Sequence, residues 1–282
     1  MKKILCLILS LLLFLLPEFA AAETAEEEIE IEEIMEGQEG AEAAAWSFPV
    51  ALEDMDPVFV VLANKHYLLD KEFYAKPLVK AKKLKLNKDG SVKTAGVRVA
   101  VSSTMKLQED CYNALVAMSD AARADGYNLY LKSAYRSWQT QNTMYKNRLK
   151  KNKGKDDGWV SKAGASDHQT GLGCDVIPRS WIKAAGMNSK MAKEPECQWM
   201  AEHCQEYGFI IRYPEDKEAV TEIHYEPWHL RYVGIPAATY IMENGLCLEE
   251  FTDELQQAIR DYLEAGGDRS RVEAFIQNPT EE

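Results

Sequence analysis

The sequence SDHQTGLGCD occupies residues 166–175, and a second short segment, EPWH, follows at residues 226–229. Together they hold two of the five histidines of the chain and several carboxylates. Two imidazole nitrogens, a carboxylate oxygen and a further carboxylate are the groups that a catalytic zinc site uses as ligands and as general base, with an open position for water. The two segments therefore predict a metal-dependent hydrolase whose fold must bring them together.

The spacing within the first segment predicts its local structure. His168 and Asp175 are seven residues apart, and in an uninterrupted strand they would face opposite sides, more than about 20 Å from each other. Gly171 and Gly173 permit the chain to turn between them. We therefore expect His168 on a loop and Asp175 on the strand that follows.

The second segment requires a bend. Glu226 and His229 are three residues apart, a spacing that shares a face on a helix but not on a flat strand. The preceding residues are strand-like, and Pro227 cannot donate a hydrogen bond within a sheet. A bend at Pro227 would bring Glu226 to the water while His229 binds the metal. His224 is an alternative ligand, because strand alternation places it on the same face as Glu226.

The N-terminus has the pattern of an export signal. Lys2 and Lys3 precede an apolar run at residues 4–16, and three alanines follow at 20–22, as in a secretory signal peptide. We expect residues 1–22 to be removed and the mature protein to be extracytoplasmic, either secreted or in the cell-wall or periplasmic space. The run is short for a transmembrane helix, so a membrane tether is expected only if this segment stays uncleaved.

The net charge of -12 is concentrated in one segment. Residues 23–45 contain ten Glu and no Lys or Arg, so that residues 46–282 carry only about -3. A Glu-rich segment without aromatic side chains cannot bury enough apolar surface to fold alone. Residues 23–50 are therefore predicted to form a disordered acidic spacer. The nearly balanced remainder lacks the basic surface that nucleic-acid binding requires.

The cysteines add nothing to the predicted site. Beyond Cys6, which lies in the predicted signal peptide, five cysteines remain, and no CxxC pair occurs. This pattern indicates neither a disulfide framework nor a thiolate zinc cluster, and we expect buried free thiols. Cys174 is expected to point away from the metal, because adjacent strand residues alternate between faces.

Periodicity and capping residues predict helices grouped around short strands. Helices are expected over residues 107–122, from Ser137 to about 149, over 196–207 and beyond 251, and strands over 127–134, 173–177, 209–213 and 220–228. The apolar segment 58–62 is compatible with a strand or a helix. This order predicts an α+β domain in which a small antiparallel sheet carries the zinc site and helices flank it. We place this domain at residues 51–251 and a helical C-terminal tail at 252–282.

These motifs resemble those of the VanY-type D-alanyl-D-alanine carboxypeptidases and the related L,D-carboxypeptidases, zinc peptidases of bacterial peptidoglycan. The family pattern SxHxxGxxxD followed by ExWH occurs here with the same internal spacings, and SAYRS at residues 133–137 matches a third signature. The resemblance runs from about residue 62 to residue 250. It implies one Zn²⁺ ion bound by His168, Asp175 and His229, with Glu226 as the catalytic base.

The resemblance also implies a substrate pocket. Arg136 would hold the terminal carboxylate of the substrate or help to stabilise the oxyanion, a role that suits a planar bidentate guanidinium. Gln141, Ser166 and Tyr213 match further pocket residues of the family. The loop at residues 150–162 is more lysine-rich than the family pattern, which leaves specificity open.

The implied function is removal of the C-terminal D-alanine from peptidoglycan stem peptides by an exported zinc carboxypeptidase. Two alternatives share the same metal site: an L,D-carboxypeptidase acting on tetrapeptide stems, and a peptidoglycan endopeptidase. A non-catalytic module that binds the cell wall is an alternative of another class. A structural zinc site, however, has no use for the additional carboxylate of Glu226.

Overall fold

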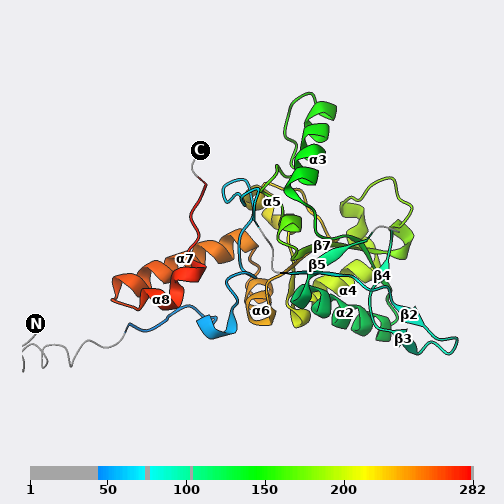
Figure 1. Cartoon of the computed structure of the whole chain (residues 1–282), viewed down its shortest axis with the longest axis horizontal. Helices are drawn as coiled ribbons and strands as arrows, with labels where there is room; N and C mark the ends of the chain where they lie inside the picture. The colour runs from blue at the N-terminus through cyan, green and yellow to red at the C-terminus, as the bar shows by residue number, and fades with distance from the viewer. Residues whose placement is uncertain (1–43, 74–76, 102–103, 281–282) are drawn as a thin grey trace, which may run out of the picture. The chain divides into compact units, whose positions relative to one another are not determined.

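The sheet that carries the candidate site combines strands from distant parts of the chain. The structure, a computed structural model, describes residues 44–73, 77–101 and 104–280, and residues from Ala45 onward form one compact unit (Figure 1). Five strands lie in the order β4-β6-β7-β9-β8. Their bounds are Arg98–Val99 (β4), Leu129–Ser133 (β6), Gly173–Pro178 (β7), Phe209–Ile211 (β8) and His229–Tyr232 (β9).

The strand pairs around the site are antiparallel, as predicted, but β4 joins β6 in parallel. Two smaller sheets pair β1 (Leu78–Lys80) with β5 (Lys106–Gln108) and β2 (Lys85–Leu86) with β3 (Val92–Thr94). The helices are α2 (Glu109–Ala124), α3 (Trp138–Lys151), α4 (Pro195–His203), α5 (Glu218–Thr221), α6 (Ile235–Glu243), α7 (Leu248–Glu264) and α8 (Arg269–Val272). This mixture of helices and small sheets confirms the predicted α+β class.

The helix ends follow the predicted capping residues. Ser137 caps α3, because its hydroxyl accepts the Thr140 backbone N–H at 3.3 Å. Helix α4 continues as a 3-10 turn to Tyr207 and ends at Gly208, whose φ of 78° lies in the left-handed region. Within the described residues, no helix is both long and apolar enough to span a membrane.

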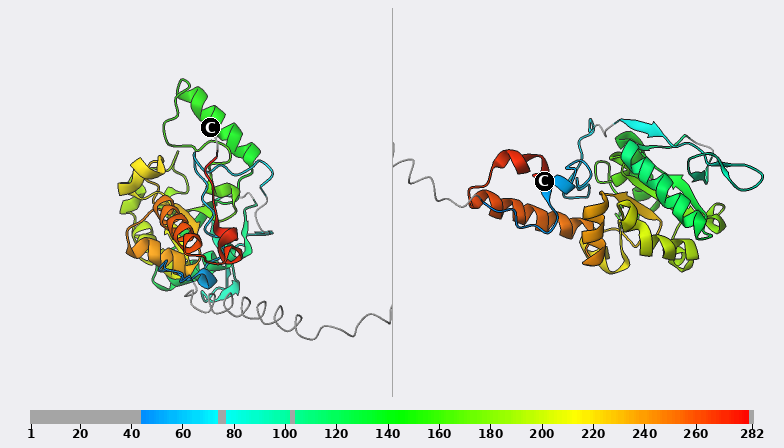
Figure 2. Two further views of the ribbon diagram at one scale, coloured as in Figure 1. Left: turned by 90° about the vertical axis from the view of Figure 1, so that its left-hand side faces the viewer. Right: turned by 90° about the horizontal axis from the view of Figure 1, so that it is seen from below.

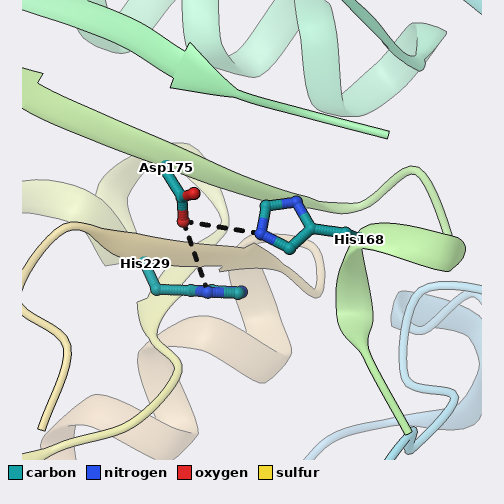
Figure 3. A group of neighbouring side chains, drawn as sticks. All are labelled: His168, Asp175 and His229. Carbon is teal, nitrogen blue, oxygen red and sulfur yellow. Dashed lines mark ion pairs between the residues drawn. The ribbon is translucent and has the colours of Figure 1, made fainter. Parts of the chain in front are cut away.

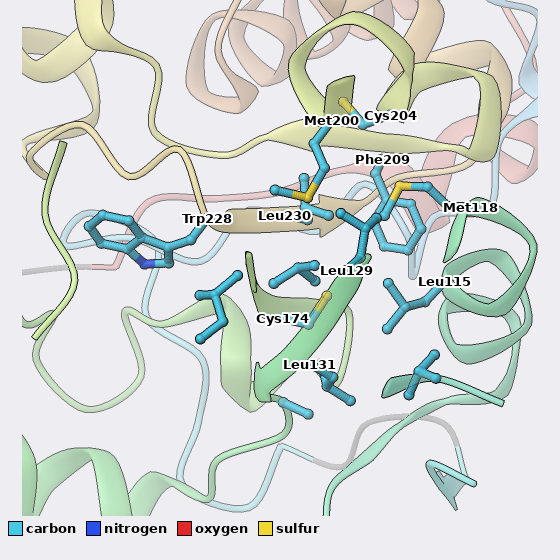
Figure 4. Close-up of a cluster of buried hydrophobic side chains, with 14 of the residues drawn as sticks. Leu115, Met118, Leu129, Leu131, Cys174, Met200, Cys204, Phe209, Trp228 and Leu230 are labelled. Atoms are coloured by element: carbon cyan, nitrogen blue, oxygen red, sulfur yellow. The ribbon is translucent and has the colours of Figure 1, made fainter. Parts of the chain in front are cut away.

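The core lies between one face of the five-stranded sheet and helices α2 and α4 (Figure 4). Leu115 and Met118 of α2, and Met200 of α4, pack here with Cys174 of β7 and Leu230 of β9, each at most 1% exposed. Because successive strand residues point to opposite faces, the neighbours of Cys174 and Leu230 face away from this core. The candidate site occupies that opposite side. All five cysteines of the described residues are buried free thiols, as predicted.

The predicted strand at residues 220–228 is wrong. Its first residues complete α5, and Glu222 then adopts a left-handed φ of 55°. The Glu218 carboxylate accepts the Tyr225 backbone N–H at 2.7 Å and lies 3.2 Å from the His224 ring nitrogen Nδ1. These local side-chain contacts hold the segment as a loop in spite of its β-branched composition. The strand β9 begins only at residue 229.

The apolar segment at residues 58–62 forms neither a strand nor a helix. Val60 and Leu62 are nevertheless buried, at 0% and 2% exposure. The Gln277 side chain accepts the Leu62 backbone N–H at 2.7 Å and donates to the Val60 carbonyl at 3.2 Å. A single distant side chain therefore satisfies backbone groups that a sheet or helix would otherwise pair.

Residues on both sides of the predicted domain boundaries make contacts with each other. Trp46 packs edge-on against Tyr262 of α7, with ring centroids 5.9 Å apart, and Phe48 packs against Phe251 at 5.6 Å. The backbone of this N-terminal segment runs beside α7 (Figure 2). Aromatic side chains thus attach the last residues of the predicted spacer to α7, and α7 itself crosses residue 251. The predicted signal peptide and the spacer up to residue 43 lie outside the described residues.

Candidate active site

His168 lies in a short 3-10 turn, Asp167–Gln169, that precedes β7. Its Nδ1 is 2.7 Å from the carbonyl oxygen of Ala134, the residue after β6. Because a carbonyl only accepts, this contact assigns a proton to Nδ1 and leaves the Nε2 lone pair free for a metal. The His168 carbonyl accepts the Arg136 backbone N–H at 2.9 Å, so residues 134–136 support both the ligand and the arginine.

Asp175 and His229 are direct cross-strand partners on β7 and β9. Asp175 Oδ1 lies 3.4 Å from His229 Nδ1 and 3.5 Å from His168 Nε2 (Figure 3). The carboxylate therefore stands between the two imidazole rings, whose centroids are 4.9 Å apart. We call these three side chains the ligand cluster.

Two glycines allow His168 and Asp175 to lie close together, each for a different reason. Gly171 has a φ of 74°, in the left-handed region that glycine adopts readily, and it supplies the predicted turn between His168 and Asp175. Gly173 lies inside β7, and a Cβ placed there would be only 2.8 Å from the Cβ of Asp167. This second glycine is required for close packing and not, as predicted, for the turn.

The ligand cluster fits a metal ion. Its side chains are buried, and Asp175 Oδ1 has no hydrogen-bond partner among the described residues. A buried carboxylate oxygen without a partner is costly, unless a cation binds it. Four tetrahedral zinc bonds of about 2.0–2.1 Å place neighbouring ligand atoms about 3.3 Å apart. The observed separations of 3.4 and 3.5 Å agree with this spacing.

Glu226 lies beside the ligand cluster, three residues before the start of β9. The His229 backbone N–H donates to the Glu226 carbonyl at 3.0 Å, which closes a turn with Pro227 at its second position and confirms the predicted bend. Glu226 Oε2 is 3.1 Å from His229 Nδ1. Burial raises the pKa of Glu226 above its ordinary value, although the hydrogen bond with His229 acts in the opposite direction.

The other charges of the site depend on one another. Burial lowers the pKa of His168, and the charge of Arg136 lowers it further. Burial also opposes ionisation of Asp175, but its interactions with the His168 and His229 imidazoles outweigh burial and lower the Asp175 pKa. For His229, burial disfavours the charged form, yet the hydrogen bond with Glu226 and the charge of Asp175 raise its pKa. An ionised carboxylate between two imidazoles is a donor set for a divalent cation.

Arg136 reaches the same pocket from the end of β6. Its Nη1 donates to Gln141 Oε1 at 2.7 Å, and its Nη2 donates to Ser133 Oγ at 3.3 Å. Gln141 in turn donates from Nε2 to the Ser161 carbonyl at 2.6 Å and is 1% exposed. Both ends of this amide are engaged within the protein. Gln141 therefore orients the Arg136 guanidinium in addition to lining the pocket.

All eight residues predicted from the sequence line one pocket: Arg136, Gln141, Ser166, His168, Asp175, Tyr213, Glu226 and His229. Tyr213 is buried, and its ring meets the His229 ring edge-on at 5.0 Å. Sequence reasoning missed the rest of the lining, namely Met144, Trp159, Val160, Ser161, Met187, Ile223 and Trp228. Three of these, residues 159–161, come from the loop after α3, where no motif indicates a role in the site.

The alternative ligand, His224, lies apart from the ligand cluster. Its ring packs against Trp159, with centroids 4.7 Å apart, and its side chain is 42% exposed. Because the preceding segment is a loop, the strand alternation that placed His224 beside Glu226 does not apply. Within the described residues, the ligand cluster is the one group of three such side chains close enough to share an ion.

The fold and the site together define a class of protein. A small sheet that presents two histidines and an aspartate in a buried pocket, with a glutamate and an arginine beside them, is the arrangement of a metallo-carboxypeptidase. The chain belongs to the VanY family of D-alanyl-D-alanine carboxypeptidases, whose pattern matches residues 104–235.

An alignment with one relative, which covers most of that protein, supports this membership. The bifunctional D-Ala-D-Ala dipeptidase and D-Ala-D-Ala carboxypeptidase VanXYC of Enterococcus gallinarum is 34% identical over 136 residues, which cover 48% of this chain and 72% of that protein. The chain spans about half the length of other curated relatives that it matches, between 46% and 55% of each.

Two solved structures share the fold. The LdcB LD-carboxypeptidase aligns with a TM-score of 0.61 at 30% identity, covering 74% of this chain and 98% of that one. A mutant of the D,D-pentapeptidase VanY from a VanB-type vancomycin resistance cassette, in complex with Zn(II), aligns with a TM-score of 0.50 at 28% identity. That alignment covers 69% of this chain and 98% of the other.

Proposed function

We propose that the protein is an exported zinc-dependent carboxypeptidase that removes the C-terminal D-alanine of peptidoglycan stem peptides. The observation that carries the proposal is the buried Asp175 Oδ1, which lies 3.4–3.5 Å from two imidazole nitrogens and beside Glu226 and has no hydrogen-bond partner in the described part of the chain. Membership of the VanY family and the Zn(II) complex of a related D,D-pentapeptidase support the metal and the substrate class. The N-terminal pattern at residues 1–22 supports export.

The side chains present divide the chemistry between them. A zinc ion held by the ligand cluster would act as a Lewis acid and lower the pKa of a bound water. Glu226 would accept the proton of the attacking water and return it to the leaving amine. Arg136 would bind the terminal carboxylate of the peptide through the N–H groups that Gln141 and Ser133 leave free.

An L,D-carboxypeptidase acting on tetrapeptide stems is the second candidate. It is favoured by the alignment with LdcB, which has a higher TM-score, 0.61, than the alignment with VanY, 0.50. Both candidates use the same ligand cluster and the same arginine. Trp159 and Val160, from the loop after α3, and Met187 are apolar residues that line the pocket but belong to none of the sequence motifs. We propose that these side chains select the penultimate residue of the peptide.

Mass spectrometry of pentapeptide and tetrapeptide stems after incubation, with and without a chelator, tests the proposal. We expect the pentapeptide to lose one D-alanine and the chelator to prevent this loss. Shortening of the tetrapeptide alone would favour the L,D-carboxypeptidase. Shortening that continues in excess chelator would contradict the zinc assignment, and cleavage inside the peptide would favour an endopeptidase.

Replacing Arg136 with alanine is expected to weaken cleavage of free-acid peptides selectively. Loss of a charge-assisted contact with the terminal carboxylate should raise KM and lower kcat/KM by about 10- to 100-fold. Comparison of free-acid with C-terminally amidated stem peptides measures the effect. The wild type should prefer the free acid, and R136A should lose that preference. Equal cleavage of both peptides by the wild type would contradict a carboxypeptidase.

A further inference from the structure

Four charged side chains form a buried network directly behind the ligand cluster. They are Asp167, Arg212, Arg231 and Glu249, with exposures of 0%, 0%, 0% and 6%. Arg212 donates from Nε to Asp167 Oδ2 at 2.6 Å and makes two parallel bonds of 2.7 Å to the Glu249 carboxylate. Arg231 donates from Nη1 to the other oxygen of Asp167. We call these four residues the charge network.

The charge network is attached to the site at three points. Asp167 precedes the ligand His168, and Arg231 lies two residues after the ligand His229 on the same face of β9. Arg212 precedes Tyr213, and its guanidinium carbon lies 4.7 Å from the centroid of that ring, which packs edge-on against His229. The buried ion pairs therefore hold a residue next to each histidine: Asp167 beside His168, and Arg231 on the same strand as His229.

The fourth member comes from beyond the residues that the family pattern matches. Glu249 lies in the first turn of α7, beyond the matched residues 104–235. It also accepts a hydrogen bond from Asn64 Nδ2 at 3.2 Å, and Arg231 donates to the carbonyls of Phe59 and Val61 at 2.8 and 2.7 Å. The charge network thus connects the N-terminal segment and α7 to the site.

The formal charges of the charge network balance, with two carboxylates and two guanidiniums. Removal of the Glu249 charge would leave a net positive charge in the protein interior, next to the place where a cation binds. It would also leave the two Nη donors of Arg212 without a charged acceptor, although Nε would still donate to Asp167, and a buried donor that loses its charged partner is strongly unfavourable. Both effects act against the binding of a divalent cation by His168 and His229.

We propose that Glu249 is a positioning residue of the metal site, acting through Arg212 and Asp167, so that α7 is part of the catalytic unit. The proposal rests on the proposed function, because it assumes that the ligand cluster holds zinc. It assigns a role to α7 that packing alone does not require, since an apolar contact would hold the helix equally well. A neutral side chain at position 249 should therefore weaken zinc binding even where the fold persists.

Zinc affinity of Glu249→Gln, measured by competition with a chromogenic chelator, tests the proposal without reference to activity. We expect the dissociation constant for zinc to rise by about 10- to 100-fold, as for other residues that support metal ligands, and kcat to fall more than KM rises. Glu254→Gln is the matched control, because it removes the same charge from an exposed position on α7 and should change neither quantity. Wild-type zinc affinity in folded E249Q would overturn the proposal.

Glu249→Asp keeps the test decisive if E249Q does not fold. Aspartate retains the charge but is shorter, so we expect zinc affinity between those of the wild type and a neutral variant. A folded E249D with lower thermal stability and unchanged zinc affinity would show a purely structural role and overturn the proposal. Absence of zinc binding by the wild-type protein would be a different result, because it would contradict the proposed function itself.

Discussion

Replacing Glu226 with glutamine is expected to abolish most hydrolysis while leaving zinc in place. Glutamine has nearly the same shape, so it can occupy the same place beside the ligand cluster, where Glu226 Oε2 lies 3.1 Å from His229 Nδ1. It cannot accept a proton, and loss of a general base lowers kcat by about 10²- to 10⁴-fold. The measurements are kcat on stem peptides and the zinc content of the purified variant.

The control for this experiment is Glu215→Gln, which removes the same charge from an exposed position outside the pocket and should leave kcat unchanged. Full activity of E226Q would mean that another group removes the proton, and the mechanism proposed above would be wrong. If the wild type binds stem peptides and zinc but cleaves nothing, the non-catalytic wall-binding module becomes the better interpretation.

Replacing Asp175 with asparagine is expected to remove the metal. Asp175 contributes the only carboxylate of the ligand cluster, and its Oδ1 lies 3.4 and 3.5 Å from the two histidine nitrogens. Because changes at residues that merely support ligands cost about 10- to 100-fold in affinity, loss of this ligand charge should weaken zinc binding by more than about 100-fold. Hydrolysis at limiting zinc should fall in parallel.

Thermal unfolding provides a readout for D175N that is independent of catalysis. A ligand that binds only the folded state raises its melting temperature, so added zinc should stabilise the wild type and leave D175N nearly unchanged. Asp216→Asn, at an exposed position, should respond to zinc as the wild type does. A zinc-dependent stabilisation of D175N equal to that of the wild type would exclude Asp175 as a ligand.

Local patterns predicted the elements that depend on local chemistry. The helix capped by Ser137, the stop at Gly208 and the turn at Gly171 all follow from backbone preferences within a few residues. The same reasoning was wrong for residues 220–228, where the Glu218 carboxylate accepts a hydrogen bond from the Tyr225 backbone N–H, seven residues further along the chain. Strand propensity alone does not reveal such competition, because it describes composition and not hydrogen bonding.

The sequence predicted the surroundings of some site residues better than those of others. Spacing was sufficient to predict His168 on a loop, Asp175 on the following strand and a turn at Gly171 between them. It was insufficient for Gln141, whose burial and double engagement depend on the loop carbonyl of Ser161. Asp167 is the clearest omission: two buried arginines bind it, and both are distant in the sequence, so no local pattern indicates this role.

By itself, the sequence SDHQTGLGCD and its partner EPWH determined which side chains can bind a metal and which can act as a base, because these properties belong to the residue types and their spacing. Only the tertiary structure decided how the ligands meet, through the cross-strand pairing of Asp175 with His229. It also decided that Glu249 of α7 closes the buried charge network behind them. Arg212 and Glu249 are 37 residues apart in the sequence, and only the folded chain brings them together and buries them, so no local pattern predicts their ion pair.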